Sequence, residues 1–191
     1  MTRITIIDGH PDPAEGRFIH SLADAYEAGA GAAGHHIRRI SVASLEFPLV
    51  RTQSEWEHGV VPRDIEQAQA AIMEAEHLVI LYPLWLGDMP ALLKAFLEQV
   101  ARPTFAFRYR EKGFPEKLLR GRSARIIVTM GMPAILYRIV YRSHSLKSLE
   151  RNILGFSGVK PTRHSIIGSI AHQRQRDRWL KRVESLGRRG A

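Results

Sequence analysis

The chain has no cysteine among its 191 residues. The absence of thiols excludes disulfides, zinc–thiolate sites, iron–sulfur clusters and a cysteine nucleophile. Long hydrophobic runs are also missing, because the longest, Leu78–Leu81 followed by Tyr82–Leu86, is far shorter than the ~20 apolar residues of a membrane-spanning helix. The first residues lack the apolar stretch and the small-residue cleavage site of a signal peptide. We therefore expect a cytoplasmic protein with no membrane insertion.

Acidic residues are scarce in the second half of the chain. Residues 102–191 carry 21 Lys and Arg against 5 Asp and Glu, whereas residues 1–101 carry 7 against 14, and the net charge is +9. A basic half suits a phosphorylated ligand, a nucleic acid or the acidic half of a second copy, or it is a solvated surface. Because no nucleic-acid-binding motif accompanies the charge, we expect no nucleic-acid partner.

Strand-like and helical segments alternate along the chain. The predicted strands are 3–8, 36–41, 77–82, 125–129 and 160–167, and the predicted helices are 18–28, 64–76, 92–100 with Asp88 as its cap, 146–154 and 171–187. Glycines at 29, 31 and 34 are expected to end the first helix. This alternation predicts one α/β domain over residues 1–191: a doubly wound, five-stranded parallel sheet in the order 2-1-3-4-5, with helices on both faces.

Ligands of such a sheet bind beyond the carboxyl ends of the strands, where the winding reverses. Three loops fall there: 9–17, 83–90 and 130–134. The first ends at a helix start, where free N–H groups and Arg17 favour a phosphate. The second offers Trp85 and Leu86 as an apolar wall beside Gly87 for a flat cofactor. The alternatives are that Arg17 is an exposed helix-start residue and that Trp85 packs on the core.

Three stretches resemble the NAD(P)H dehydrogenase (quinone) family, whose fold is flavodoxin-like. They are His10-Pro-Asp-Pro with Phe18, the string Pro83-Leu-Trp-Leu-Gly-Asp-Met-Pro-Ala-Leu-Leu-Lys-Ala-Phe96, and the Lys112-Gly113 turn before Thr129-x-Gly131. The family includes quinone reductases, modulators of drug activity and potassium-efflux ancillary proteins. The resemblance covers the chain from the first strand to about residue 160, in the right order.

The resemblance implies a flavin-dependent oxidoreductase. A bound FMN, or FAD, would take hydride from NADPH or NADH and pass two electrons to a quinone or a similar small acceptor. The residues that would bind the cofactor are His10, Arg17, Phe18 and Ile19 at its phosphate end, Pro83, Leu84, Trp85, Leu86 and Gly87 along the flavin ring, and Thr129, Met130, Gly131 and Met132 on the ring's other side. No metal is implied. The alternative is a flavodoxin-like regulatory, ancillary or electron-carrier protein.

Two departures from the family's pattern bear on cofactor binding. The family often has Ser-Phe-Asn where this chain has Arg17-Phe18-Ile19, so a hydroxyl ligand for the phosphate is missing and Arg17 would replace it. The family's Thr-Thr-Gly-Gly is Thr129-Met130-Gly131-Met132 here, which puts the flavin contacts of that loop in question.

By the same resemblance, a tyrosine and a histidine beyond this loop would assist hydride transfer, and Tyr137 and His144 fall near those positions. Such residues would hydrogen-bond the flavin carbonyl as negative charge develops on the ring. The alternatives are a core or interface tyrosine and a surface histidine.

The irregular stretch 101–123 mixes Phe105, Phe107, Tyr109 and Phe114 with arginines, which is typical of an interface core. The acidic and basic halves and the family resemblance also favour a homodimer that completes the active site. A monomer whose own loop covers the flavin is the alternative.

Overall fold

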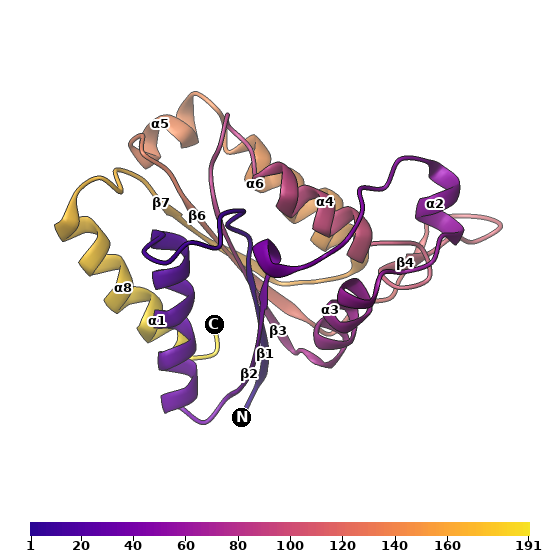
Figure 1. The fold of residues 1–191 in the computed structure, drawn as a ribbon, viewed down its shortest axis with the longest axis horizontal. Coiled ribbons are helices and arrows are strands. Elements are labelled where there is room, and N and C mark those ends of the chain that lie inside the picture. Colours follow the sequence, from indigo (N-terminus) through magenta and orange to yellow (C-terminus); the bar gives the residue numbers. More distant parts are fainter.

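The computed structural model describes residues 1–191. Figure 1 shows a central twisted sheet with helices against both faces. The main strands are β1 (Arg3–Asp8), β2 (His36–Ser41), β3 (His77–Pro83), β6 (Ser123–Thr129) and β7 (Thr162–Ile167). They form one parallel sheet in the order β2-β1-β3-β6-β7. The predicted doubly wound sheet and its strand order are confirmed.

One face of the sheet is covered by two helices from opposite ends of the chain. These are α1 (Phe18–Ala32) and α8 (Gln173–Arg188), which lie side by side in Figure 1. They approach closely at two glycines: a Cβ on Gly29 would lie 2.0 Å from the carbonyl oxygen of Glu184, and one on Gly187 would lie 2.1 Å from that of Tyr26. Only residues without a side chain allow the two backbones this contact.

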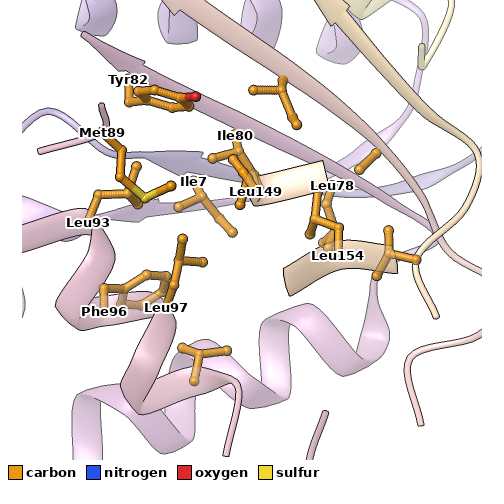
Figure 2. Close-up of a cluster of buried hydrophobic side chains, with 14 of the residues drawn as sticks. Ile7, Leu78, Ile80, Tyr82, Met89, Leu93, Phe96, Leu97, Leu149 and Leu154 are labelled. Carbon is orange, nitrogen blue, oxygen red and sulfur yellow. The ribbon is translucent and has the colours of Figure 1, made fainter. Parts of the chain in front are cut away.

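The opposite face carries two longer helices and a run of short helical segments. They are α3 (Arg63–Glu74), α4 (Ala91–Val100), α6 (His144–Ser148), the π-helical segment η2 (Leu149–Leu154) and α7 (Gly155–Ser157). Figure 2 shows how Leu93, Phe96 and Leu97 of α4 and Leu149 and Leu154 of η2 meet strand residues such as Ile7 and Ile80. Because both faces of the central strands are covered, β3 is buried along its whole length, as its continuous apolar sequence predicts.

Shorter elements fill residues 42–63 and 101–123, which lie between the predicted helices and strands. The first contains η1 (Val42–Ser44) and α2 (Gln53–His58), and the second contains the two-stranded ribbon of β4 (Phe107–Arg108) and β5 (Glu116–Lys117). A further short helix, α5 (Ala134–Ile139), follows β6. None of the helices combines the length and the apolar composition needed to cross a bilayer.

Several helix ends differ from the sequence prediction, and the structure gives the physical reason for two of them. α1 continues through Gly29 and Gly31 to Ala32, because Gly29 is a packing contact with α8; the chain turns at Gly34, where φ is +76°. Asp88 does not cap α4. Its carboxylate accepts from the N–H of Met89, 2.7 Å away, and Pro90 takes the cap position.

Candidate functional site

Three loops meet at the carboxyl edge of the sheet, and we call them together the rim. They are the first loop (Gly9–Arg17), the second loop (Leu84–Pro90) and the third loop (Met130–Pro133), which follow β1, β3 and β6. These strands are neighbours, and backbone hydrogen bonds join the loop starts: the N–H of Gly9 donates to Leu81, 2.8 Å away, and that of Leu84 to Thr129, 2.7 Å away. The sequence-predicted cofactor loops therefore lie next to one another.

A buried carboxylate organises the first loop. Asp8, at the end of β1, is 1% exposed. It accepts from Arg39 Nη2 at 2.8 Å, from His20 Nδ1 at 2.7 Å and from the backbone N–H of His10 at 3.3 Å. The second ring nitrogen of His20 lies 3.0 Å from the carbonyl oxygen of Asp12. These contacts fix both ends of the loop relative to the sheet.

His10 is held with one ring nitrogen facing the rest of the loop. Its Nδ1 lies 3.1 Å from the backbone nitrogen and 3.2 Å from the carbonyl oxygen of Asp12. Burial and the neighbouring His20 lower the pKa of His10, so the ring is neutral near pH 7. It meets Trp85 of the second loop edge to face, with centroids 5.8 Å apart.

The start of α1 presents donors and positive charge. No side chain caps this helix, and the N–H groups of Phe18 and Ile19 make no hydrogen bond within the chain, while their side chains are buried in the core. Arg17 is exposed and forms an ion pair with Asp12 across the loop. The guanidinium of Arg176 lies 4.9 Å from the ring centre of Phe18 and adds a second cation. Free helix N–H groups beside cations are typical of a phosphate site.

Sequence reasoning missed Arg176. It lies on α8, about 160 residues after the first loop, and it reaches the rim only because α8 packs on α1. No local spacing in the sequence signals that contact.

The second loop makes a tight left-handed turn. Trp85 and Asp88 exchange backbone hydrogen bonds of 2.8 and 2.9 Å, and the residues between them, Leu86 and Gly87, have φ of 50° and 83°. Positive φ at both central positions defines a type I′ turn. The turn leaves Leu86 fully exposed and Trp85 half exposed, and the N–H groups of Leu86 and Gly87 make no hydrogen bond within the chain.

The third loop is open at its glycine. Pro83, Thr129 and Met130 are buried beneath the rim, whereas Gly131 is exposed and Met132 is half-buried. No atom lies within 4 Å of a Cβ built on Gly131, and the N–H groups of Gly131 and Met132 have no partner within the chain. The second and third loops thus offer free backbone donors on two sides of one rim.

Tyr137 lies elsewhere than the sequence predicts. Its side chain is fully buried, and its hydroxyl contacts Ser145 Oγ at 2.7 Å and accepts from the N–H of Leu146 at 3.1 Å. Both partners belong to α6, so this hydroxyl ties α5 to α6 and does not face the rim.

Tyr141 and His144 stand at the rim beside the second loop. A Cβ on Gly87 would lie 3.6 Å from Cε1 of Tyr141 and 3.8 Å from Cε1 of His144. His144 therefore lies beside the second loop, and its catalytic role stays a prediction. Tyr141 was missed by sequence reasoning, although its position three residues before His144, about one helical turn, was a usable signal.

Comparisons with known proteins agree with this arrangement. The model of a family described as Flavodoxin-like fold matches residues 2–186, so the chain belongs to this family. An uncharacterized NAD(P)H oxidoreductase of Haemophilus influenzae is 25% identical over 169 residues, which cover 86% of this chain and 83% of that relative. The fold and the family expected from the sequence motifs are confirmed.

Further relatives are matched over shorter stretches. FMN-dependent NADH:quinone oxidoreductase 1 of Hahella chejuensis is 36% identical over 97 residues, or 50% of this chain and 43% of that protein. The chain thus spans less than half the length of this relative. The solved NAD(P)H:quinone oxidoreductase from Methanothermobacter marburgensis superposes with a TM-score of 0.83 at 24% identity and covers 98% of both chains, which shows a shared fold.

Proposed function

We propose that the chain is an FMN-dependent NAD(P)H:quinone oxidoreductase whose cofactor binds at the rim. The observation that carries this proposal is the set of free N–H groups, apolar side chains and cations that three loops bring together there. The names of the relatives, which include FMN-dependent NADH:quinone oxidoreductases, support the same cofactor and reaction. The proposal treats residues 1–191 as one domain.

The residues of the rim fit a phosphorylated flavin. The N–H groups of Phe18 and Ile19, with Arg17, would hold the phosphate at the start of α1. The free N–H groups of the second and third loops would donate to polar atoms of the ring, and the exposed faces of Trp85 and Leu86 would contact its apolar part. Because this set provides a single phosphate cradle, it favours FMN over FAD.

Bound FMN would supply two-electron chemistry, taking a hydride from a nicotinamide and giving electrons to a quinone. The protein's contribution is positional and electrostatic. Trp85 and Leu86 would shield one side of the bound ring from water. The backbone donors at Leu86 and Gly87 are fixed by the turn before any charge develops, so they stabilise negative charge without reorganisation.

Tyr141 and His144 would act at the same place through the hydrogen-bonding atoms of their side chains. The Tyr141 hydroxyl can donate a hydrogen bond. The Nδ1 of His144 faces a carbonyl oxygen and therefore carries a proton, so its Nε2 accepts when the ring is neutral and donates when the ring is protonated. The pair can thus hold a proton next to the developing charge.

A homodimer is part of the proposal. Four apolar side chains at the rim end of the molecule are exposed: Ile135, Leu136, Ile139 and Val140, on and just after α5. A contiguous apolar surface next to a pocket is typical of an interface, and a second copy covering it would shield the rim from water. Sedimentation at micromolar concentration tests this, since a single species near 22 kDa would contradict it. We further propose a cytoplasmic location.

The absorbance spectrum of the purified protein tests the function. We expect flavin bands that NADPH or NADH bleaches within seconds and that a quinone restores. Steady-state kinetics should be ping-pong, because one open rim serves nicotinamide and acceptor in turn. A flavin-free protein would contradict the proposal, and a flavoprotein that neither nucleotide reduces would favour the electron-carrier or ancillary alternative.

A further inference from the structure

A second, strongly basic hollow lies beside the rim. Its volume is about 280 Å³, and it is lined by six residues of the α5–α6 turn, α6 and η2: Arg142, His144, Lys147, Ser148, Arg151 and Asn152. Three of the six are permanent cations and none is acidic. The volume is below the roughly 300–1,000 Å³ typical of a pocket for a whole small molecule, so the hollow suits one polar group of a larger ligand.

The cations of this hollow are not neutralised within the chain. Arg142, Lys147 and Arg151 form no ion pair with any Asp or Glu, whereas other exposed arginines, such as Arg38 and Arg188, do. Like charges held on one helical face repel one another, which is unfavourable unless a ligand supplies the opposite charge. This pattern therefore points to an anion.

The turn that delivers Arg142 is conformationally costly. Arg142 and Ser143 have φ of 50° and 51°, so two consecutive residues with side chains adopt the left-handed region. Residues other than glycine rarely do so, and such outliers concentrate at functional sites. The turn starts α6 at His144, so the same conformation places His144 at the rim and Arg142 at the hollow.

The hollow and the rim share a residue and so form one surface. His144 lines the hollow and also lies beside Gly87 of the second loop. From His144 the basic side chains continue along the same helical face to Arg151, about two turns away. Ser148 and Asn152 also border the neighbouring cavity of about 580 Å³, which is lined by side chains such as Trp56 and Phe156. A ligand reacting at the rim can therefore extend into the hollow and place an aromatic part beyond it.

We propose that this hollow binds the 2′-phosphate of NADPH and makes NADPH the preferred hydride donor over NADH. The inference rests on the proposed function, because it assumes a nicotinamide at the rim. A phosphate monoester supplies the missing negative charge and accepts charge-assisted hydrogen bonds from arginine and lysine. NADH has a hydroxyl at the same position and would leave the three cations without a partner.

Titration calorimetry of the purified full-length protein with NADP⁺ and NAD⁺ tests the inference without turnover. We expect NADP⁺ to bind at least about 10-fold more tightly than NAD⁺, as strong charge-assisted contacts require. The triple variant R142Q/K147Q/R151Q should lose this difference while its NAD⁺ affinity stays within about 2-fold. Lys181→Gln on α8, an exposed lysine on the other face of the sheet, is the matched control and should bind as wild type.

Equal affinity for the two nucleotides in the wild type, or an unchanged preference in the triple variant, would overturn the inference. A triple variant that alters only the sedimentation of the protein would also overturn it, because the cations would then face a second copy. Flavin bleached equally by NADH and NADPH would leave the proposed function standing and remove the inference. Selective NADP⁺ binding without flavin reduction would leave the inference standing and contradict the proposed function.

Discussion

His144 Nδ1 lies 3.0 Å from the carbonyl oxygen of Tyr141, and the two rings stack with their centroids 6.2 Å apart. The hydrogen bond fixes which nitrogen of His144 faces away from the backbone, and the stacking fixes where the tyrosine ring lies. Both side chains are exposed next to Gly87, so they form one polar unit at the edge of the rim.

Removal of either member of this unit should slow flavin reduction. We expect Tyr141→Phe and His144→Gln each to slow it by about 10- to 1000-fold, the range for loss of one preorganised donor. The FMN content should not change, since neither side chain lies at the phosphate end. Stopped-flow reduction by NADPH measures the effect, with His36→Gln, an exposed residue at the start of β2 and so at the opposite edge of the sheet from the rim, as control. Wild-type rates in both variants would remove these residues from the mechanism.

Tyr137→Phe should affect stability and leave the rate of flavin reduction unchanged. The substitution leaves the N–H of Leu146 and the hydroxyl of Ser145 without their buried partner. The expected loss is about 1–3 kcal/mol in the free energy of unfolding. Urea unfolding measures it, and stopped-flow rates of the folded variant separate the two roles. A stable variant with slow reduction would restore Tyr137 as a rim residue.

The contrast between these tyrosines shows where sequence reasoning ends. The central strands were predictable because parallel strands buried on both faces carry continuous β-branched and apolar runs, and β1 has the predicted ends. Which tyrosine reaches the rim depends on the turn at Arg142 and Ser143. Neither is a glycine, so no turn signal in the sequence reveals their left-handed conformation.

The glycines of α1 show a second limit. In sequence, Gly29 and Gly31 read as helix stops, because glycine destabilises a helix interior. In the fold, Gly29 is required by its backbone contact with Glu184, which lies 155 positions later in the chain. Gly31 has space around it, because a Cβ placed on Gly31 would have only the side chain of Ile37 nearby, at 3.8 Å. Local propensity cannot distinguish the two positions.

These two glycines should therefore respond oppositely to alanine. Gly29→Ala places a Cβ 2.0 Å from a backbone oxygen, which forces α1 and α8 apart and should cost about 3 kcal/mol or more. Gly31→Ala meets no obstacle and should stabilise the protein by about 0.5–1 kcal/mol through helix propensity. Urea unfolding measures the change in the free energy of unfolding of both variants. Equal changes would show that the contact between α1 and α8 does not control stability.

His77 should make the fold sensitive to mild acid. Burial, followed by the charges of Arg125 and Arg163, lowers the pKa of His77 from its ordinary 6.5 to about 4. Between these values the unfolded chain binds a proton that the folded chain does not, so stability is full above pH 6.5 and declines as the pH falls toward 4. The difference corresponds to about 3 kcal/mol.

Urea unfolding at pH 7 and pH 4.5 measures this effect. His77→Gln removes the titrating ring while keeping a polar group near Ser123, whose Oγ lies 2.7 Å from the histidine Nδ1. The variant should lose less stability than wild type over this interval. An identical pH dependence in both proteins would show that other groups cause the acid sensitivity.

Arg17 and Asp12 should have opposite effects on FMN retention. The carboxylate of Asp12 forms an ion pair with the Arg17 guanidinium. The pKa of Asp12 lies below its usual range, because the carboxylate accepts from the N–H of Ala14 and contacts this guanidinium. Asp12 therefore remains ionised near neutral pH and competes with a phosphate for the same cation. Arg17→Ala should weaken FMN binding by about 10- to 100-fold, as expected for one charged hydrogen bond.

Asp12→Asn is the informative partner of this variant. It removes the competing charge while the amide oxygen can still accept from the N–H of Ala14, 2.9 Å away in the wild type, so the loop should keep its shape. We therefore expect Asp12→Asn to retain FMN at least as tightly as wild type through dialysis, and Arg17→Lys to fall between wild type and Arg17→Ala. Fluorescence of the released flavin measures all three. If Arg17→Ala holds FMN as tightly as wild type, the helix N–H groups and Arg176 bind the phosphate without Arg17. If Asp12→Asn loses FMN, the carboxylate of Asp12 positions Arg17 and does not compete with the phosphate for it.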